Sequence, residues 1–496
     1  MDIKKLHEKP PYAMIAILFV GAFVAFLNNT LLNIALPTIM DEFQVSPSAV
    51  QWLTTGFMLV NGILIPASAF FIQKFTNRSL FITAMSLFSL GTLIAMIAPS
   101  FGLLVAARMI QASGSAMMMP LLMNIMLTAF PVEKRGSAMG LFGLVMFTAP
   151  AIGPTLSGWV IEQYSWRTLF GIVLPFSVFT LVYAIFKLRN ITPNRDVKID
   201  LFSLVLSSIG FGGLLYGFSS AGDKGWSTPI VYGTIIIGTI ALTAFVVRQI
   251  RLDEPMLDFK IYKYPMFALS SVISVTLSIA MFSAMILTPL YVQSVREISP
   301  FYAGLLMLPG AVLMGIMSPI TGRLFDKYGA RTLAITGLTI TIITTYYLSR
   351  LGMDSGYYYI MIIYTARMFG ISMVMMPVMT NGLNQLPMIS NPHGTAMNST
   401  LQQVSGAIGS AVLLTIMTKR MESSEVKLLT EAKASGNVPS TAEGLAAFKD
   451  QLGKLAMLDG INFAFFISTI VAVGALVLAF FIKRVIPPKD DMERTK

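Results

Sequence analysis

Two arginines, Arg108 and Arg367, stand inside apolar stretches long enough to cross a membrane. An arginine near the bilayer centre costs roughly 2.5 to 3.5 kcal/mol on insertion scales, so each should face a bundle interior or a watery cavity. The chemistry available to such a residue is electrostatic. Gln111 follows Arg108 by three residues, so both side chains lie near one face of a helix. We interpret Arg108 as a functional residue, with a clamp on backbone carbonyls as the alternative, and we favour the clamp for Arg367.

Amides are concentrated in the first apolar stretch, which contains Asn28, Asn29 and Asn33 within six residues. Asn29 and Asn33 are four residues apart and stack on one helical face. A polar stripe facing a cavity is our interpretation, and hydrogen bonding between helices is the alternative. The second apolar stretch adds Trp52 and Asn61 to this set of candidate pathway residues.

None of the 24 acidic residues falls well inside the predicted spans, although Glu162 lies at the outer end of the fifth and Asp459 just before the fourteenth. The nearest are Asp41 and Glu42 at the outer end of the first span, and they are our candidates for carboxylates that bind protons. The chain has no cysteine and only two histidines, His7 and His393. We therefore predict no catalytic residues, no metal site and no cofactor.

The composition is that of a polytopic membrane protein. Of 496 residues, 55% are apolar and only 12% are charged, against about 25% charged in a soluble domain. Apolar runs predict an all-α fold with fourteen spans. The predicted spans are 12–37, 49–71, 80–98, 101–130, 137–163, 166–187, 201–219, 229–248, 265–292, 302–324, 332–350, 356–383, 395–418 and 461–483.

The distribution of basic residues predicts the orientation. If both termini lie inside, the inner segments hold 23 of the 35 lysines and arginines, the outer segments ten, and the spans two. The positive-inside rule therefore predicts a multi-pass protein of the cell membrane with both termini in the cytoplasm. The net charge of +11 then comes from basic residues in the segments on the cytoplasmic side of the lipid bilayer, and it does not indicate binding to nucleic acid. No cleavable signal peptide is evident at the start.

Four sequence blocks occur twice. They are Ala69–Leu80 with Gly322–Leu333, Ala107–Met109 with Ala366–Met368, Met118–Pro120 with Met375–Pro377, and Gly136–Met139 with Gly394–Met397, at offsets of 253 to 259. Such spacing predicts two parallel repeats of six spans.

The repeats predict the domain organisation. We expect an N-terminal six-helix bundle at 1–190, two inserted linker helices at 191–260, a C-terminal six-helix bundle at 261–486 and a cytoplasmic tail at 487–496. A long outer loop is expected at 419–460, with a short amphipathic helix after Ser440 lying on the outer surface or, alternatively, a frayed loop.

The fifth span is rich in glycine and proline. Gly153, Pro154 and Gly158 fall in an almost wholly apolar run. Small residues let a neighbouring backbone approach closely, and proline bends the helix. We expect Gly153 and Pro154 to lie at the interface between the two bundles rather than to contact cargo.

Together these segments resemble one family. RMIQASG at Arg108–Gly114 and GPTLSG at Gly153–Gly158 resemble the span-4 and span-5 motifs of major facilitator drug:proton antiporters. NNTLLNIALP in span 1 is similar to the D-x-T-x-x-N-x-A-L-P signature of their fourteen-span branch. The loop residues Gly322, Asp326, Gly329 and Arg331 resemble a motif that governs bundle closure. The resemblance covers nearly the whole chain and is strongest to lincomycin-resistance-type multidrug exporters of Gram-positive bacteria.

Two positions depart from the family pattern. Asn28 stands where the family has its span-1 acid, and Gln73 stands where the first copy of the loop motif has its aspartate. The usual carboxylate for proton coupling is therefore missing, and Asp41 or Glu42 is our substitute.

The resemblance implies a monomeric exporter that works by alternating access. It would move small amphipathic drugs outward in exchange for protons. Export of an endogenous lipid, peptide or metabolite, without proton coupling, is the alternative. A membrane-embedded enzyme is disfavoured because no cluster of catalytic residue types is present.

Overall fold

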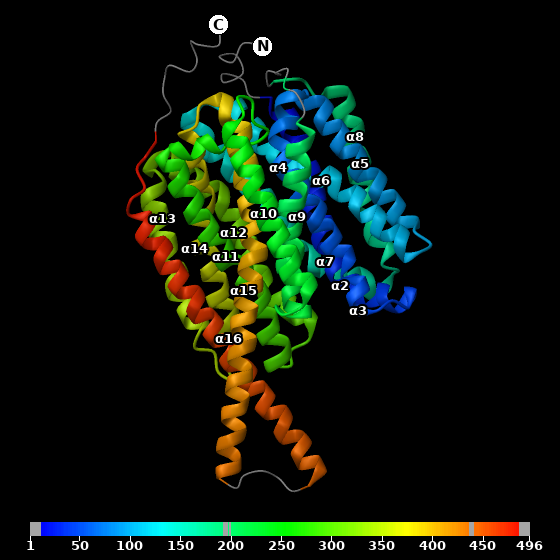
Figure 1. The fold of residues 1–496 in the computed structure, drawn as a ribbon, viewed down its shortest axis with the longest axis vertical. Helices are drawn as coiled ribbons and strands as arrows, with labels where there is room; N and C mark the ends of the chain where they lie inside the picture. The colour runs from blue at the N-terminus through cyan, green and yellow to red at the C-terminus, as the bar shows by residue number, and fades with distance from the viewer. Residues whose placement is uncertain (1–10, 192–196, 198–199, 436–440, 486–496) are drawn as a thin grey trace.

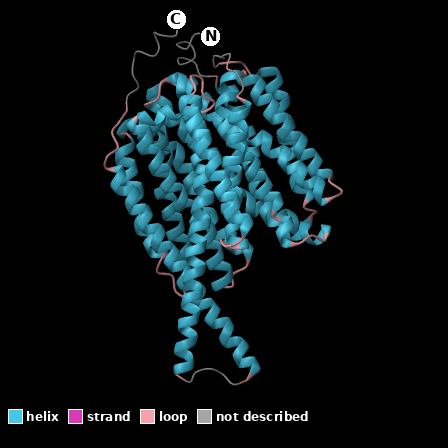
Figure 2. Ribbon diagram, viewed as in Figure 1, coloured by secondary structure: helices cyan, strands magenta, loops and turns pink. Residues whose placement is uncertain are grey.

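The computed structural model describes residues 11–191, 197, 200–435 and 441–485. Within that part of the chain every regular element is helical and no strand occurs (Figure 2). The all-α prediction is confirmed. This follows from long apolar segments, which can satisfy their backbone hydrogen bonds in a bilayer only as helices or closed barrels.

The long helices follow the predicted spans closely. The first six are α2 (Tyr12–Phe43), α4 (Trp52–Lys74), α5 (Asn77–Ile97), α6 (Phe101–Ala129), α7 (Arg135–Gln163) and α8 (Arg167–Lys187). The inserted pair is α9 (Leu201–Lys224) and α10 (Pro229–Arg251). The last six are α11 (Pro265–Leu290), α12 (Pro300–Tyr328), α13 (Ala330–Leu348), α14 (Tyr357–Asn384), α15 (Asn391–Ala434) and α16 (Ala442–Ala479). Short helical segments are α3 (Pro47–Val50), η1 (Val132–Lys134), η2 (Phe259–Lys263), η3 (Tyr291–Val295) and η4 (Met388–Ser390).

Twelve of the described helices are long and apolar enough to cross a membrane. The other two long helices, α7 and α13, are outside this set. Six threonines and an arginine lower the apolarity of α13. The count of fourteen spans therefore stays a prediction at these two helices.

The helices form two groups with an inserted pair between them. In the first group α2 packs on α6, α7 and α8, and α5 packs on α6 and α8. In the second, α11 packs on α14, α15 and α16, and α13 packs on α14 and α16. We call these groups the N-half (α2 to α8) and the C-half (α11 to α16). Helix α9 contacts α10, and it also contacts α4 of the N-half and α15 of the C-half (Figure 1). The exact boundaries at 190 and 260 stay a prediction.

The described chain begins and ends at one end of the bundle, drawn at the top of Figure 1. We call this end the terminal face and the other end the opposite face. The loops before α5, α7 and α15 also lie at the terminal face, because each follows a helix that started at the opposite face.

The prediction of a long loop at 419–460 is wrong, because helices occupy most of this segment. Helices α15 and α16 continue far past the bundle at the opposite face as a helical hairpin (Figure 1). Arg420 pairs with Asp459 at 2.8 Å, and Lys454 lies 2.6 Å from Glu297. No proline interrupts 419–434, and helix-forming residues let α15 continue to Ala434. The helix expected after Ser440 is the first part of α16, which projects from the bundle rather than lying on its surface (Figure 1). The cap of α16 is Thr441, whose hydroxyl accepts from the Gly444 N–H, and the predicted cap Ser440 lies outside the described residues.

Candidate functional site

Arg108 is the centre of a buried polar network in the N-half. Its side chain is 1% exposed. Its Nη1 donates to Gln111 Oε1 at 2.7 Å, its Nε donates to the Leu53 carbonyl at 3.4 Å, and its guanidinium lies 4.3 Å from the centre of the Phe57 ring. Burial strengthens such contacts because little water competes for them. The predicted face shared by Arg108 and Gln111 is therefore present in the structure.

Gln111 extends this network to two further helices. Its Nε2 donates to Thr92 Oγ1 on α5 at 2.7 Å and to Asn28 Oδ1 on α2 at 3.3 Å, and Asn28 Nδ2 donates to Gln111 Oε1 at 3.1 Å. One glutamine thus ties α2, α5 and α6 together around the arginine. The place where the resemblance leads one to expect an acid holds the neutral amide of Asn28.

Arg367 has a different environment in the C-half. It is fully buried, and its Nε donates to Thr345 Oγ1 at 2.9 Å while its Nη2 donates to the Ala280 carbonyl at 2.7 Å. These contacts join α14 to α13 and α11. A hydroxyl and a backbone carbonyl are the partners that the clamp interpretation expects.

The contacts correct the repeat alignment at the two arginines. Gly114 and Gly370 each pack closely on the preceding long helix. A Cβ at Gly114 would lie 2.2 Å from the Ala84 carbonyl oxygen, and a Cβ at Gly370 would lie 2.7 Å from the Gly337 carbonyl oxygen. Ala84 and Gly337 are 253 residues apart, as are Thr92 and Thr345.

Arg367 precedes Gly370 by three residues, as Gln111 precedes Gly114. It contacts Thr345 as Gln111 contacts Thr92. Arg367 therefore takes the place of Gln111, and Arg108 has no basic counterpart in the C-half. The sequence match of Ala107–Met109 with Ala366–Met368 was misleading by three residues.

The other candidate pathway residues are dispersed. Asn29 is partly buried, and the Asn33 side chain lies outside the described residues. Trp52 is 39% exposed and lies beside Tyr216 of α9, with ring centres 5.9 Å apart. Asn61 has a buried Oδ1 for which the structure gives no hydrogen-bond donor. Only Asn28 of this group joins Arg108 and Gln111.

The two candidate acids differ in their surroundings. Asp41 is exposed at the end of α2. Glu42 accepts from Arg167 Nη1 at 2.6 Å and from Trp166 Nε1 at 2.6 Å. Desolvation raises the pKa of Glu42, but the hydrogen bonds from Arg167 and Trp166 outweigh it and leave this pKa below its ordinary value. Glu42 is thus held ionised, whereas an acid that loads and releases protons near neutral pH needs a raised pKa.

The halves meet most closely along α7 and α12, near the terminal face. A Cβ at Gly140 would lie 2.5 Å from the Ser318 carbonyl oxygen, and a Cβ at Gly322 would lie 2.2 Å from the Gly136 carbonyl oxygen. Both distances are too short for any side chain, so these glycines permit backbone contact between the halves. Gly136 and Gly140 were not among the interface residues that the sequence predicted, although they precede the span-5 motif on the same helix.

Asp326 reinforces this contact from the C-half. Its Oδ1 accepts from the Gly136 N–H at 2.9 Å, and its Oδ2 accepts from the Ser137 N–H at 2.9 Å and the Ser137 hydroxyl at 2.6 Å. Gly136 and Ser137 lie in the first turn of α7, where backbone N–H groups have no partner within the helix. A carboxylate there is also favoured by the helix dipole. We call this set the Asp326 latch.

The remaining residues of the loop motif shape the chain around Asp326. Gly329 ends α12 and has φ of +78°, a left-handed conformation that favours glycine. Arg331 is exposed in the first turn of α13. Arg484 Nη2 donates to the Asp326 carbonyl at 2.7 Å and so ties the segment after α16 to this loop.

Gly153 and Gly158 do not lie between the halves in this structure. A Cβ at Gly153 would meet Thr30 Oγ1 of α2 at 2.1 Å, and one at Gly158 would meet nothing within 4 Å. Ser157 Oγ donates to the Leu31 carbonyl at 2.6 Å. This part of α7 packs on α2 within its own half, so the expected interface role of Gly153 is not seen here. The side chain of Pro154 lies outside those described.

A second contact between the halves involves His393, which we had noted only for its rarity. His393 Nε2 lies 3.1 Å from Gln73 Nε2 of α4, and its Nδ1 accepts from the Asp258 N–H at 3.2 Å. We call this set the His393 contact. Gln73 is the position where the loop motif lacks its aspartate, and that departure was the signal that could have located the contact.

A cavity of about 460 Å³ lies between helices of both halves, toward the opposite face. Its walls come from α4, α9, α11 and α15 and carry no charged side chain. Thr55, Met58, Tyr216, Met285 and Gln403 are among the residues that line it. Ligand sites of this size are mostly apolar with a few polar groups, and methionines adapt to varied shapes. Trp52 borders this cavity through its contact with Tyr216.

The sequence matches the family model described as Major Facilitator Superfamily over residues 18–410. The chain belongs to the major facilitator superfamily. Members of this superfamily are carriers rather than enzymes, which agrees with a multi-pass protein that has a cavity lined by both halves and by α9.

Relatives within the superfamily match nearly end to end. The MFS-type transporter YhcA of Bacillus subtilis is 45% identical, with 99% of this chain and 96% of YhcA covered. The lincomycin resistance protein LmrB of B. subtilis is 43% identical, with 95% of each chain covered. The human organic anion transporter MFSD10 has a solved structure with a TM-score of 0.63 at 13% identity, covering 94% of this chain and all of that one, which supports the fold alone.

Proposed function

We propose that this protein exports small amphipathic drugs by alternating access. One observation carries the proposal. The halves are joined near the terminal face by α7, α12 and the Asp326 latch, while an uncharged cavity lies between them toward the opposite face. This is the arrangement expected of a carrier closed on one side and facing the other. Transport then requires the latch to part so that the cavity can face the terminal side.

The proposed cargo rests on two supports. LmrB, a relative similar over nearly its full length, is named for lincomycin resistance. The cavity here combines apolar walls with the polar groups of Thr55 and Gln403, and it is large enough for a drug-sized molecule. We therefore propose lincomycin as the first cargo to test.

We propose that the terminal face is cytoplasmic and that the protein lies in the bacterial cell membrane. The excess of basic residues in the segments at this face supports the orientation. Each half supplies walls of the cavity within one chain, so we propose that the monomer is the working unit.

We propose that export is driven by protons, on the basis of the antiporter motifs at Arg108–Gly114 and Gly153–Gly158. The ion pair with Arg167 makes Glu42 a poor proton carrier near neutral pH. Asp41 is then the remaining candidate of the pair. We expect Glu42→Gln to weaken packing of α2 on α8 while leaving coupling in place.

The test uses inside-out membrane vesicles, in which an exporter accumulates drug. Energised vesicles should take up labelled lincomycin above its outside concentration, and a protonophore should abolish the uptake. Vesicles carrying Arg108→Ala at the same protein level are the matched control. Uptake that survives the protonophore would reject proton coupling. Failure to take up lincomycin or any drug of an amphipathic panel would reject drug export and favour an endogenous cargo.

Asp41→Asn, compared with Asp41→Glu, tests the candidate acid. Asp41→Asn should remove gradient dependence together with uphill transport, and Asp41→Glu should retain both. If Asp41→Asn still accumulates drug against its gradient, the coupling acid lies elsewhere.

A further inference from the structure

Gln73 and Asp326 occupy equivalent places in the two halves. They are 253 residues apart, the offset of the repeated loop block, and each lies in the last turn of its helix. Asp326 reaches the first turn of α7, and Gln73 reaches His393 in the first turn of α15. Each half therefore extends one polar side chain to a helix start in the other half.

The two contacts differ in how well they are satisfied. The Asp326 carboxylate only accepts, and its three partners all donate. At His393 two of its neighbours present N–H groups: the backbone N–H of Asp258 faces Nδ1, and the amide nitrogen of Gln73 faces Nε2. A neutral imidazole has one acceptor nitrogen and one donor nitrogen. It can therefore accept only one of the two hydrogen bonds.

Turning the Gln73 amide does not remove this conflict. The same amide nitrogen donates to the Ala69 carbonyl at 3.1 Å. Exchange of the amide oxygen and nitrogen would place two oxygens in contact there. Gln73 and Asp258 thus compete for one lone pair of His393.

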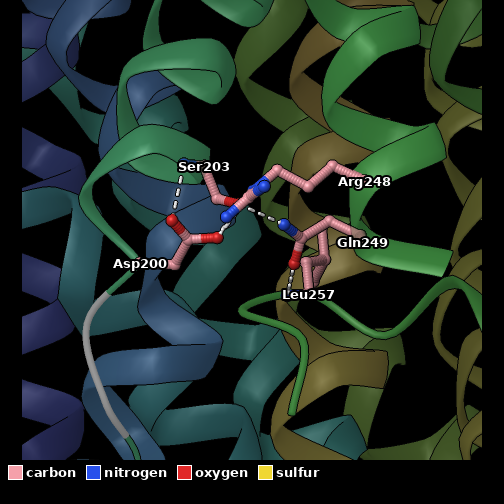
Figure 3. A network of polar contacts seen from close by, with 5 residues as sticks. All are labelled: Asp200, Ser203, Arg248, Gln249 and Leu257. Atoms are coloured by element: carbon pink, nitrogen blue, oxygen red, sulfur yellow. Dashed lines mark hydrogen bonds and ion pairs between the residues drawn. The ribbon is translucent and has the colours of Figure 1, made fainter. Parts of the chain in front are cut away.

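The inserted helices hold Asp258 in place. The neighbouring Leu257 N–H donates to Gln249 Oε1 at 3.2 Å, and Gln249 Nε2 donates to Ser203 Oγ at 2.6 Å. Ser203 and Arg248 in turn bind the Asp200 carboxylate at 2.6 and 2.8 Å (Figure 3). Gln249 is fully buried, so the segment after α10 is anchored to both α9 and α10.

We propose that the α9–α10 pair weakens the contact of His393 with Gln73 by presenting the Asp258 N–H to Nδ1, and so favours separation of the halves at α4 and α15. The proposal rests on the alternating access proposed above. It gives the inserted helices a role in setting the equilibrium between the closed and open terminal face. His393 acts here as a positioning residue.

The experiment measures the distance between the halves at this point. The chain has no cysteine, so Ser79→Cys beyond α4 and Ile389→Cys before α15, both at exposed positions, can carry a spin-label pair without background. The reconstituted full chain is studied by pulsed electron resonance without drug or gradient. Asp258→Pro removes the competing N–H, and the φ of −81° at Asp258 suits proline. Asp258→Asn keeps the N–H and is the matched control.

Asp258→Pro should raise the ratio of short to long distances about three- to tenfold, because His393 becomes free to accept from Gln73. Asp258→Asn should leave the ratio unchanged, and His393→Ala should lower it. If the Asp258 N–H only anchored His393, Asp258→Pro should instead lower the ratio of short to long distances. An unchanged ratio, a fall like that of His393→Ala, or an equal rise in Asp258→Asn would overturn the proposal.

A second variant decides the matter if Asp258→Pro does not fold. Gln249→Leu releases Leu257 from α10 and should also raise the short-distance population, while Thr243→Val on the exposed face of α10 should not. No change in Gln249→Leu would overturn the proposal. Because the distances are read without cargo, a protein that fails to export drugs but shows these shifts would reject the proposed function and leave this inference standing.

Discussion

The N-half and the C-half place different chemistry at equivalent positions. The N-half has a buried arginine, Arg108, which donates to the amide of Gln111 and to the Leu53 carbonyl, and Gln111 in turn bonds to the amide of Asn28. The C-half has a buried arginine in the place of Gln111, bound to a hydroxyl and a carbonyl. At the terminal face the C-half supplies the charged carboxylate of Asp326, and the N-half supplies the neutral amide of Gln73. The fold repeats, but the N-half pairs a charged Arg108 with a neutral Gln73, whereas both corresponding contacts of the C-half use charged side chains, Arg367 and Asp326.

This difference suggests a division of labour. Amide partners can rotate and exchange hydrogen bonds around Arg108, whereas Arg367 is held by groups that have little freedom. We expect Arg108 to respond to cargo or protons and Arg367 to hold α11, α13 and α14 together. The four predictions below test this contrast, from the largest expected effect to the smallest.

Arg108→Ala should reduce export at least about a hundredfold while the protein still inserts. Two or more hydrogen bonds to a charged group are lost, at about 1.5 to 3 kcal/mol each. Arg108→Lys should rescue poorly because lysine lacks the planar fork of donors. Efflux is measured at matched protein level in the membrane.

Arg367 provides the comparison for that measurement. Arg367→Lys should keep most export, since an ammonium can still donate to Thr345 and the Ala280 carbonyl. Wild-type efflux in Arg108→Ala, or equal loss in Arg108→Lys and Arg367→Lys, would contradict the division of labour.

Asp326→Asn should open the terminal face. It replaces charge-assisted hydrogen bonds to Gly136 and Ser137 and removes the favourable interaction with the start of α7, at a cost of about 2 kcal/mol, or about thirtyfold in the closed-to-open ratio. Gln73→Glu gives up the hydrogen bond to the Ala69 carbonyl, so its side chain can turn from that oxygen and accept from His393 Nε2–H. It should therefore act in the other direction. The rate at which a thiol reagent labels single cysteines on the terminal side of the cavity measures the opening in each variant. Equal labelling rates in the two variants would contradict the claim that the Asp326 latch is well satisfied and the His393 contact is not.

Gly140→Leu and Gly153→Leu separate the two parts of α7. The first should clash with the Ser318 backbone and hold the halves apart, lowering export of every drug about tenfold. The second should clash with Thr30 inside the N-half, so its effect should appear mainly as a lower melting temperature. A change in which drugs are exported by Gly153→Leu would instead place that residue at the binding site.

The smallest effect concerns Asp200, which joins α9 to α10 beside the halves. Desolvation raises the pKa of Asp200, but the hydrogen bonds from Arg248 and Ser203 prevail and lower it to about 2. Because the folded pKa is depressed, the stabilisation is present above the unfolded value of 3.8 and is lost as pH falls toward 2. The pair is partly exposed, so solvent screening limits the contribution to about 0.5 kcal/mol.

Thermal unfolding followed by tryptophan fluorescence between pH 3 and pH 6 checks this contribution. Asp200→Asn should lower the melting temperature slightly at pH 6 and by less at pH 3, because part of the stabilisation is already lost at pH 3. A larger difference at pH 3 than at pH 6 would contradict the assigned sign.

The sequence could predict the helices because a bilayer demands continuous apolar segments. It could also predict that Arg108 and Gln111 share a face and that Asn28 lies in a costly environment. It could not predict that Asn28 and Gln111 bond to each other, because they are 83 residues apart and the contact depends on how α2 crosses α6.

The errors have physical causes as well. The repeat alignment of Arg108 with Arg367 followed matching letters, whereas the close approaches of Gly114 and Gly370 set the register. The segment 419–460 was expected to be a loop with one short surface helix after Ser440, but α15 and α16 extend through most of it as continuous helices. Gly153 packs on Thr30 of its own half, whereas Gly136 and Gly140, earlier on α7, pack on α12.

The account depends most on closure of the terminal face by the Asp326 latch and its opening during transport. Spin labels at Glu133→Cys before α7 and Lys327→Cys at the end of α12, both exposed, report the separation directly in the reconstituted protein. We predict a short distance that dominates at rest, a second, longer distance that gains population with lincomycin, and a dominant long distance in Asp326→Asn. A single short distance under all three conditions, in a protein that still exports drug, would contradict the account.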